Sequence, residues 1–91
     1  MLREFLEASI RALVDDQEAV QIIEERNGSR LRYTIRVGEG DRGRVIGKQG
    51  RIVNALRTVA QAAAAKNRMR VQVIVQTEDG STTDEGAEDA E

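Results

Sequence analysis

Hydrophobic residues recur along this chain with two distinct periods. Near the start they recur every three or four positions, which predicts a helix that ends before Asp15-Asp16 and carries Leu2, Phe5, Leu6, Ile10, Leu13 and Val14. Short runs rich in β-branched residues follow over residues 19–25 and 31–37, and a third covers residues 69–77. These three runs predict strands.

Two of the strands alternate apolar and polar residues, so each is expected to bury one face. The inward residues are Leu31, Tyr33, Ile35 and Val37 in one strand and Met69, Val71, Val73 and Val75 in the other. Ile74 interrupts the polar side of the last strand, and the pattern does not explain it. Between the first two strands, Asn27-Gly28 predicts a tight antiparallel hairpin, because both residues accept positive φ.

The stretch between residues 42 and 57, RGRVIGKQGRIVNALR, places three glycines among helix-spaced apolar residues. Asp41 suits the N-cap of a short helix over residues 42–46, and Gly47 suits its end, where positive φ costs glycine least. A second helix is predicted from Arg51 to Lys66. The sequence therefore predicts an α+β fold in the order helix, strand, strand, short helix, glycine loop, helix, strand.

The strand order follows from the connections. A hairpin joins the first two strands, and a right-handed crossover through both helices brings the last strand in parallel beside the second. The sheet is thus mixed and three-stranded, with the helices on one face. Ninety-one residues suffice for one small domain, which we place at residues 1–77.

Charge is segregated along the chain. Residues 78–91 carry seven acids and no base, which predicts a disordered acidic tail. Residues 1–77 carry a net charge of +5, and residues 42–77 hold eight bases and no acid. Such a surface favours an anionic ligand. The alternative is a solvated basic face without a ligand.

The chain has neither cysteine nor histidine, so the usual zinc ligands and nucleophile–base pairs are missing. Carboxylates and one hydroxyl remain, but no motif places them as catalytic groups: Asp15, Asp16, Glu24, Glu25 and Ser29. We predict no enzyme activity, no metal and no cofactor. The first fourteen residues mix acids and bases with apolar positions, unlike a signal peptide or a membrane span, which predicts a soluble cytoplasmic protein.

Three kinds of phosphate-binding loop compete for the glycines. Residues 38–43 match G-x-G-x-x-G, but Gly47 stops the next helix and no acid follows until Glu78, which argues against a dinucleotide site. Residues 43–48 approach a P-loop, yet the glycine spacing is one residue short and Gln49 replaces the magnesium-binding hydroxyl. A G-x-x-G loop between two helices remains.

Residues 45–53, VIGKQGRIV, resemble the core motif of KH domains, in which an apolar pair precedes G-x-x-G and an apolar residue, here Val53, follows. The element order resembles the type II arrangement of that fold. Size and sequence together are similar to the small stand-alone bacterial KH proteins of the KhpA family, over about residues 1 to 77.

The resemblance implies an RNA-binding protein that clamps roughly four nucleotides against the loop. The phosphate-binding residues would be Gly47, Lys48, Gln49 and Gly50, flanked by Arg44 and Arg51. Val45, Ile52 and Val53 would form part of a groove floor for the bases or belong to the core, and for Val53 the core is favoured. The resemblance also implies a post-transcriptional regulator or RNA chaperone linked to cell shape, acting beside a larger KH and R3H partner.

Two alternatives stay open: a single-stranded DNA binder, and a protein–protein interaction module whose basic face is only solvated surface. Recognition by ring stacking on a sheet is disfavoured, because Phe5 and Tyr33 are the only aromatic residues and both are predicted to face inward. A helix-turn-helix is disfavoured by the strands on either side.

The helix over residues 51–66 has an apolar arc of roughly 200°, about twice what a core-facing helix needs. Val53, Leu56, Ala60 and Ala64 suit the side that faces the sheet. A second stripe is left over, formed by Ile52, Ala55, Val59 and Ala62. We predict that this stripe forms a two-fold homodimer.

Overall fold

The computed structural model describes residues 2–77 and 82–83. Its helices and strands are α1 (Leu2–Leu13), β1 (Gln21–Asn27), β2 (Arg30–Val37), α2 (Arg42–Ile46), α3 (Arg51–Lys66), β3 (Arg70–Thr77) and β4 (Thr82–Thr83). Single 3-10 turns lie at residues 17–19, 39–41 and 48–50. The α+β class and the order of the elements are confirmed.

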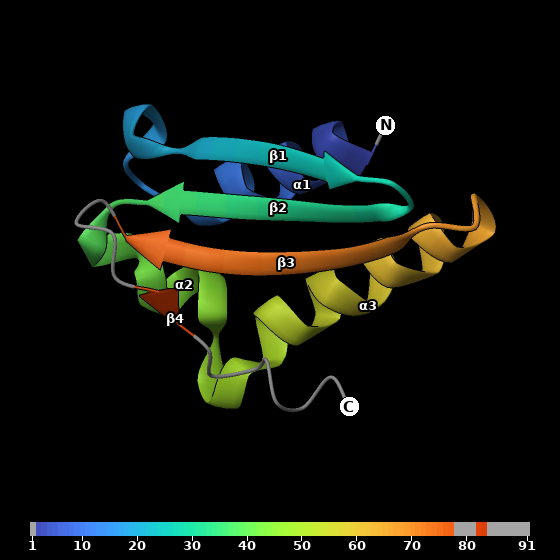
Figure 1. Ribbon diagram of the computed structural model, residues 1–91. Coiled ribbons are helices and arrows are strands. Elements are labelled where there is room, and N and C mark those ends of the chain that lie inside the picture. The colour runs from blue at the N-terminus through green and yellow to red at the C-terminus, as the bar shows by residue number, and fades with distance from the viewer. Residues whose placement is uncertain (1, 78–81, 84–91) are drawn as a thin grey trace.

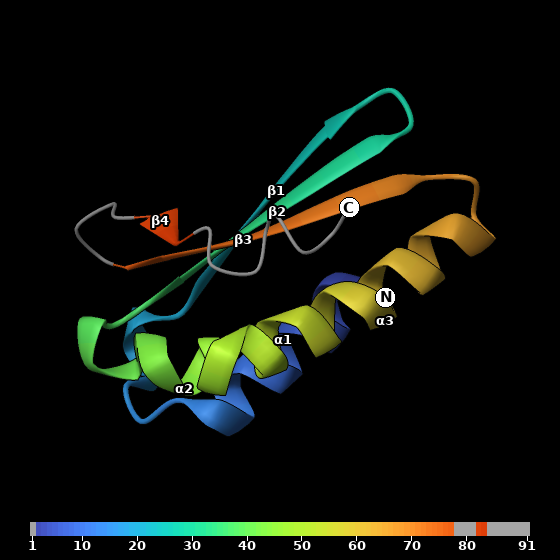
Figure 2. The same cartoon turned by 90° about the horizontal axis from the view of Figure 1, so that it is seen from below.

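The sheet has the strand order β1-β2-β3-β4. β1 and β2 are antiparallel, β2 and β3 are parallel, and the helices cover one face, as the connections predicted (Figures 1 and 2). The pair Thr82–Thr83 adds a strand that the sequence did not predict, antiparallel to β3 opposite Val75 and Gln76. Apart from this pair, the predicted acidic tail lies outside the described residues.

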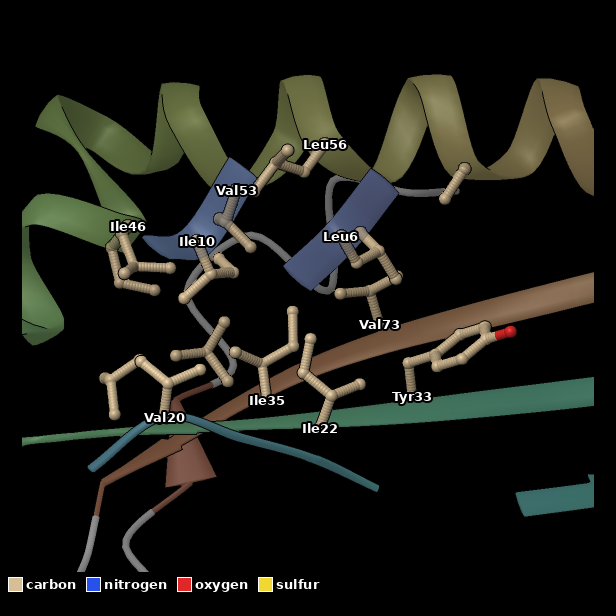
Figure 3. Close-up of a cluster of buried hydrophobic side chains, with 14 of the residues drawn as sticks. Leu6, Ile10, Val20, Ile22, Tyr33, Ile35, Ile46, Val53, Leu56 and Val73 are labelled. Atoms are coloured by element: carbon tan, nitrogen blue, oxygen red, sulfur yellow. The ribbon is translucent and has the colours of Figure 1, made fainter. Parts of the chain in front are cut away.

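The core lies between the helical layer and the sheet (Figure 3). Leu6 and Ile10 of α1, Ile35 of β2 and Val53 of α3 are fully buried there. Burial of each such side chain contributes about 1.5–3 kcal/mol. The predicted inward residues of β2 and β3 do face the helices. Phe5 does not face the core as predicted: it is 37% exposed, because the inner side of α1 is already filled by Leu6 and Ile10.

The β1–β2 turn differs from the prediction by one residue. Asn27 pairs with Arg30, so the two turn residues are Gly28 and Ser29. Only Gly28 has positive φ, at 65°. Glycine at the first central position is the requirement of a type II′ hairpin, whereas the expected use of Asn27 in the turn needs positive φ at both residues.

The backbone groups on the outer side of β3 are partly occupied. The Arg70 N–H donates to the Ser29 carbonyl beside β2, so in a parallel ladder the alternate residues Val71, Val73 and Val75 point their N–H and C=O groups away from β2. On that outer side, Nε of Arg57 donates to the Val73 carbonyl at 3.0 Å, and β4 pairs at the Val75 end. α3 is thereby tied to the edge of the sheet.

Asp41 precedes α2 as predicted, but it makes no side-chain cap hydrogen bond. Its buried carboxylate instead accepts the backbone N–H groups of Asp15 and Asp16, each at 3.0 Å, and so joins the end of α1 to the start of α2. These two hydrogen bonds lower the pKa of the Asp41 carboxyl, and the one from Asp16 has the larger effect. Burial raises the pKa, and the charge of Arg44 lowers it.

Gly47 ends α2 with φ 79° and ψ 173°, a conformation that is essentially restricted to glycine. A Cβ atom at this position would lie 2.6 Å from Cγ1 and 2.9 Å from the backbone N of Ile52. The first turn of α3 therefore packs directly on the Gly47 backbone, and only glycine fits the reversal between the two helices.

We expect the stabilising effect of Asp41 to depend on pH. Because its folded-state pKa is lowered, ionised Asp41 contributes stability that is fully present above its unfolded-chain pKa of about 3.9 and is lost as the pH falls through the folded-state value. In Asp41→Asn one of the two N–H donors faces an amide NH₂ group. Urea denaturation should therefore give a larger free energy of unfolding for the unmodified protein than for Asp41→Asn, and this difference should shrink below about pH 4. A difference that stays constant down to about pH 2 would contradict this role.

Gly47→Ala should destabilise the protein by about 1–3 kcal/mol from backbone strain, with a further loss from the contact with Ile52. Gly28→Ala is the matched control, because Gly28 also has positive φ but a Cβ there meets no atom within 4 Å. In thermal and urea denaturation, Gly47→Ala should be much less stable than Gly28→Ala. Equal losses in the two variants would show that the Ile52 contact is unimportant.

Candidate nucleic-acid interface

The loop between α2 and α3 consists of Gly47 and the single turn at residues 48–50. Positive φ occurs at Gly47 (79°), Gln49 (56°) and Gly50 (75°), and the Gly50 N–H donates to the Gly47 carbonyl at 3.1 Å. Gln49 is one of only two non-glycine residues with positive φ in the described chain. The backbone thus reverses within four residues and leads directly into Arg51, the first residue of α3.

The two side chains at the tip of the loop, Lys48 and Gln49, are exposed, as the sequence led us to expect. Gly50 precedes α3 without any side chain to cap the first N–H groups of the helix. The first of these groups, the Arg51 N–H, donates to the Lys48 carbonyl. The dipole of α3 creates a positive potential beside Lys48, so an anion approaching the tip meets this potential and a mobile ammonium group together.

The two flanking arginines have different surroundings. Arg44 forms an ion pair with Oδ2 of Asp15 at 2.6 Å and lies 3.8 Å from Oδ1 of Asp41. Arg51 is exposed and has no ion pair within the described residues. Arg51 is therefore the stronger candidate for a phosphate, while the charge of Arg44 is partly neutralised.

The apolar residues assigned to a groove floor separate in the structure. Val45 and Val53 are fully buried in the core, so neither reaches the surface beside the loop. Ile52 is only partly buried, and it packs against the edge of the core next to Gly47. Of the three, Ile52 alone is placed to contact a ligand. For Val45, the expectation of a groove contact does not agree with its burial.

Arg57 is one of the eight bases of residues 42–77, which the sequence predicts to lie on the surface, but it is only 6% exposed. Its Nε donates to the Val73 carbonyl and its Nη1 to Oδ1 of Asn54 at 3.3 Å. The helical period offered a signal for this burial, because residue 57 follows the core position Leu56 and shares a face with Val53, Ala60 and Ala64. Arg57 is a structural residue that joins α3 to β3.

The structure also bears on other kinds of site. Tyr33 is only 3% exposed, so its ring is a core side chain. In the described part of the chain, no group of three or more acidic residues is arranged to hold a metal ion. None of the helices in residues 2–77 has both the length and the apolar composition that crossing a membrane requires.

Comparison with known proteins gives consistent matches. The family model described as KhpA/KhpB, KH domain, matches residues 3–75. The chain is 40% identical over 75 residues to RNA-binding protein KhpA of Listeria monocytogenes, covering 80% of this chain and 99% of the relative. It is 42% identical over 72 residues to RNA-binding protein KhpA of Clostridium acetobutylicum, covering 79% of this chain and 96% of the relative.

A more distant relative, RNA-binding protein KhpA of Chlamydia pneumoniae, is 36% identical over 77 residues, which cover 85% of this chain and 99% of the relative. The matched region begins in α1, ends in β3 and contains the whole Gly47–Gly50 loop. The chain therefore belongs to the KhpA/KhpB family of KH-domain proteins.

Proposed function

We propose that this protein is a non-catalytic RNA-binding protein that holds the backbone of single-stranded RNA at the Gly47–Gly50 loop. The observation that carries the proposal is the exposed loop tip, Lys48-Gln49, which leads directly into the uncapped N-terminus of α3. The relatives, which the chain covers almost completely, are named RNA-binding proteins. Their full-length match supports the same function here.

In this proposal, successive phosphates approach the loop closely because Gly47 and Gly50 have no side chains. The dipole of α3 favours a phosphate at the start of the helix, and Lys48 and Arg51 neutralise its charge. The bases of roughly four nucleotides lie beside Ile52, where apolar contact discriminates weakly between them. Modest sequence preference follows, since most of the interaction energy comes from the backbone.

Residues 1–77 form the binding domain in this proposal, and the acidic residues of 78–91 lie beyond it. RNA of the bacterial cytoplasm would be the ligand, and post-transcriptional regulation or RNA chaperoning the role. Single-stranded DNA offers the same phosphates but lacks the 2′-hydroxyl, which is the group that distinguishes RNA at such a site. A module that only binds other proteins would have no need for the positive charges of Lys48 and Arg51 at the loop.

Lys48→Asp/Gln49→Asp tests the clamp. Both residues are exposed, and Asp tolerates the positive φ of residue 49, so the fold should persist. The variant places two negative charges where phosphates must lie. Affinity for a single-stranded RNA of about six nucleotides should fall by at least about tenfold, measured by fluorescence anisotropy at constant salt.

The matched control is Asn67→Asp/Arg68→Asp, which changes the net charge equally in the turn after α3, where residue 68 also has positive φ. This control should keep most of the affinity. A loop variant that binds RNA as well as the unmodified protein would exclude the clamp. Equal affinity of the unmodified protein for DNA of the same sequence would favour the single-stranded DNA alternative.

We also propose that α3 joins two copies of the chain. The four residues of the predicted stripe are not in the core: Val59 is 50% exposed, Ala55 and Ala62 are exposed, and Ile52 is partly buried. The opposite side of the helix is buried, with Val53, Ala60 and Ala64 among the core residues. α3 therefore has a second apolar face outside the fold.

The order of residues in this stripe suits a two-fold pairing with itself. When two α3 helices pack antiparallel around a two-fold axis near residue 57, Ile52 lies opposite Ala62 and Ala55 lies opposite Val59. Each large side chain then faces a small one. Such alternation lets two helices pack closely without a gap, and the same face would suit a larger partner with a related KH domain.

Val59→Glu should convert the protein into a folded monomer, because it puts a charge at the centre of the stripe. Gln61→Glu is the control, since residue 61 is exposed about 140° around the helix from the middle of the stripe. Sedimentation at tens of micromolar should give a dimer for the control and a monomer for Val59→Glu. An unmodified protein that sediments as a monomer at this concentration would end the proposal.

A further inference from the structure

The face of the sheet opposite the helices is open, and Figure 1 looks onto it. The strand register arranges its residues in rows that cross β1, β2 and β3. One row is Asn27, Arg30 and Arg70, the next is Glu25, Arg32 and Gln72, then Ile23, Thr34 and Ile74, and last Gln21, Arg36 and Gln76. Ile74, which the strand pattern left unexplained, lies with Ile23 and Thr34 in the short apolar row.

This open face carries four arginines and one acid. Arg32 is 3.5 Å from Oε1 of Glu25, and Nε of Arg36 donates to Oε1 of Gln76 at 3.1 Å. Arg30 and Arg70 have no ion pair or side-chain hydrogen bond within the described residues, and both are exposed. The face therefore has an excess of positive charge concentrated at the start of β2 and β3.

Arg30 and Arg70 lie directly opposite one another across the β2–β3 ladder. Like charges in this arrangement repel and destabilise a sheet. The pair contributes nothing to the core, and a neutral polar residue at either position would remove the repulsion. A bound anion between the two guanidinium groups converts this repulsion into a shared attraction, and arginine suits phosphate because it donates in a planar fork.

The end of the sheet beside this pair is hollowed. An open cavity of about 740 Å³ is lined on the open face by Glu25, Asn27, Arg30, Arg32, Arg70 and Gln72, and on the helix-facing side by Arg26, Leu31 and Val71. It lies at the β1–β2 turn, on a different part of the molecule from the Gly47–Gly50 loop. Side-chain amides of Asn27 and Gln72 supply further hydrogen-bonding groups. Along β2, Arg30 and Arg32 are about 6.6 Å apart, so successive cations follow one direction across the hollow.

We propose that this open face binds the backbone of the same RNA strand, beyond the nucleotides held at the loop, with a phosphate between Arg30 and Arg70. The inference rests on the proposed RNA-binding function. The described chain extends 35 Å along its longest axis, whereas a strand of about 20 nucleotides reaches about 68 Å even at 3.4 Å per nucleotide. A long RNA therefore has the length to reach both surfaces. We expect a strand of about six nucleotides to occupy the loop, where the proposed function places roughly four nucleotides.

Arg30→Gln/Arg70→Gln tests this surface against RNA strands of about 6 and about 20 nucleotides. For the longer strand, affinity at about 0.1 M salt should fall on the order of tenfold. The slope of log affinity against log salt should decrease by about 0.7, the contribution of the one phosphate that Arg30 and Arg70 neutralise together. For the shorter strand, affinity should stay unchanged. The melting temperature should not fall, because the substitution removes a repulsive pair.

The charge control is Arg3→Gln/Arg11→Gln, which removes two charges from α1, in the layer behind the sheet. Arg3 donates to the Ile22 carbonyl and Arg11 to Glu7, so the melting temperature of this control is measured together with its affinity. The control should bind both RNAs as the unmodified protein does. The inference is wrong if the open-face variant and this control have the same affinity for the longer strand. That result is expected if the face binds an acidic protein instead of RNA. The inference is also wrong if both strand lengths lose affinity equally. Loss of RNA binding in Lys48→Asp/Gln49→Asp but not in the open-face variant would retain the proposed function and exclude only the second surface.

Discussion

The contact on which the helical layer depends is the one between the Asp41 carboxylate and the backbone N–H groups of Asp15 and Asp16. α2 has only five residues, too few to be stable as an isolated helix, so its position comes from its contacts. Asp41 fixes its beginning against the segment after α1, and burial of Val45 and Ile46 fixes its inner side. Where α2 ends, the loop begins, so this carboxylate indirectly sets the place and direction of the loop tip.

The protein separates its stabilising residues from its binding residues by layers. Aliphatic side chains fill the space between helices and sheet, whereas the charged residues lie at the loop and on the open face. Asp41 and Arg57 are exceptions: both are buried, and Arg57 is a cation used inside the fold to hold α3 against β3. Because the charged residues of the two proposed RNA surfaces lie outside the core, each surface can vary in charge without loss of the fold. The helical stripe adjoins the loop surface, because Ile52 belongs to both.

Sequence patterns predicted most of the fold because its local signals agree. Asp41 and the two loop glycines indicated where α2 ends and α3 begins, and the strand alternation indicated the buried faces of β2 and β3. Two features that the sequence did not predict depend on long-range contacts. Asp41 accepts hydrogen bonds from Asp15 and Asp16, which lie 26 and 25 positions away, and Val45 is buried by elements distant in sequence. The arginine rows of the open face required the register of three strands, which no single strand contains.

The outer edge of β3 has a consequence for how copies of this chain meet. An edge strand with free N–H and C=O groups is a template on which another strand can add, and this leads to sheet-to-sheet aggregation. Here the guanidinium of Arg57 occupies the Val73 carbonyl, and β4 covers the backbone near Val75. With these groups occupied, a second molecule cannot extend the sheet through that stretch of backbone, and association is directed to side-chain surfaces, where it is reversible.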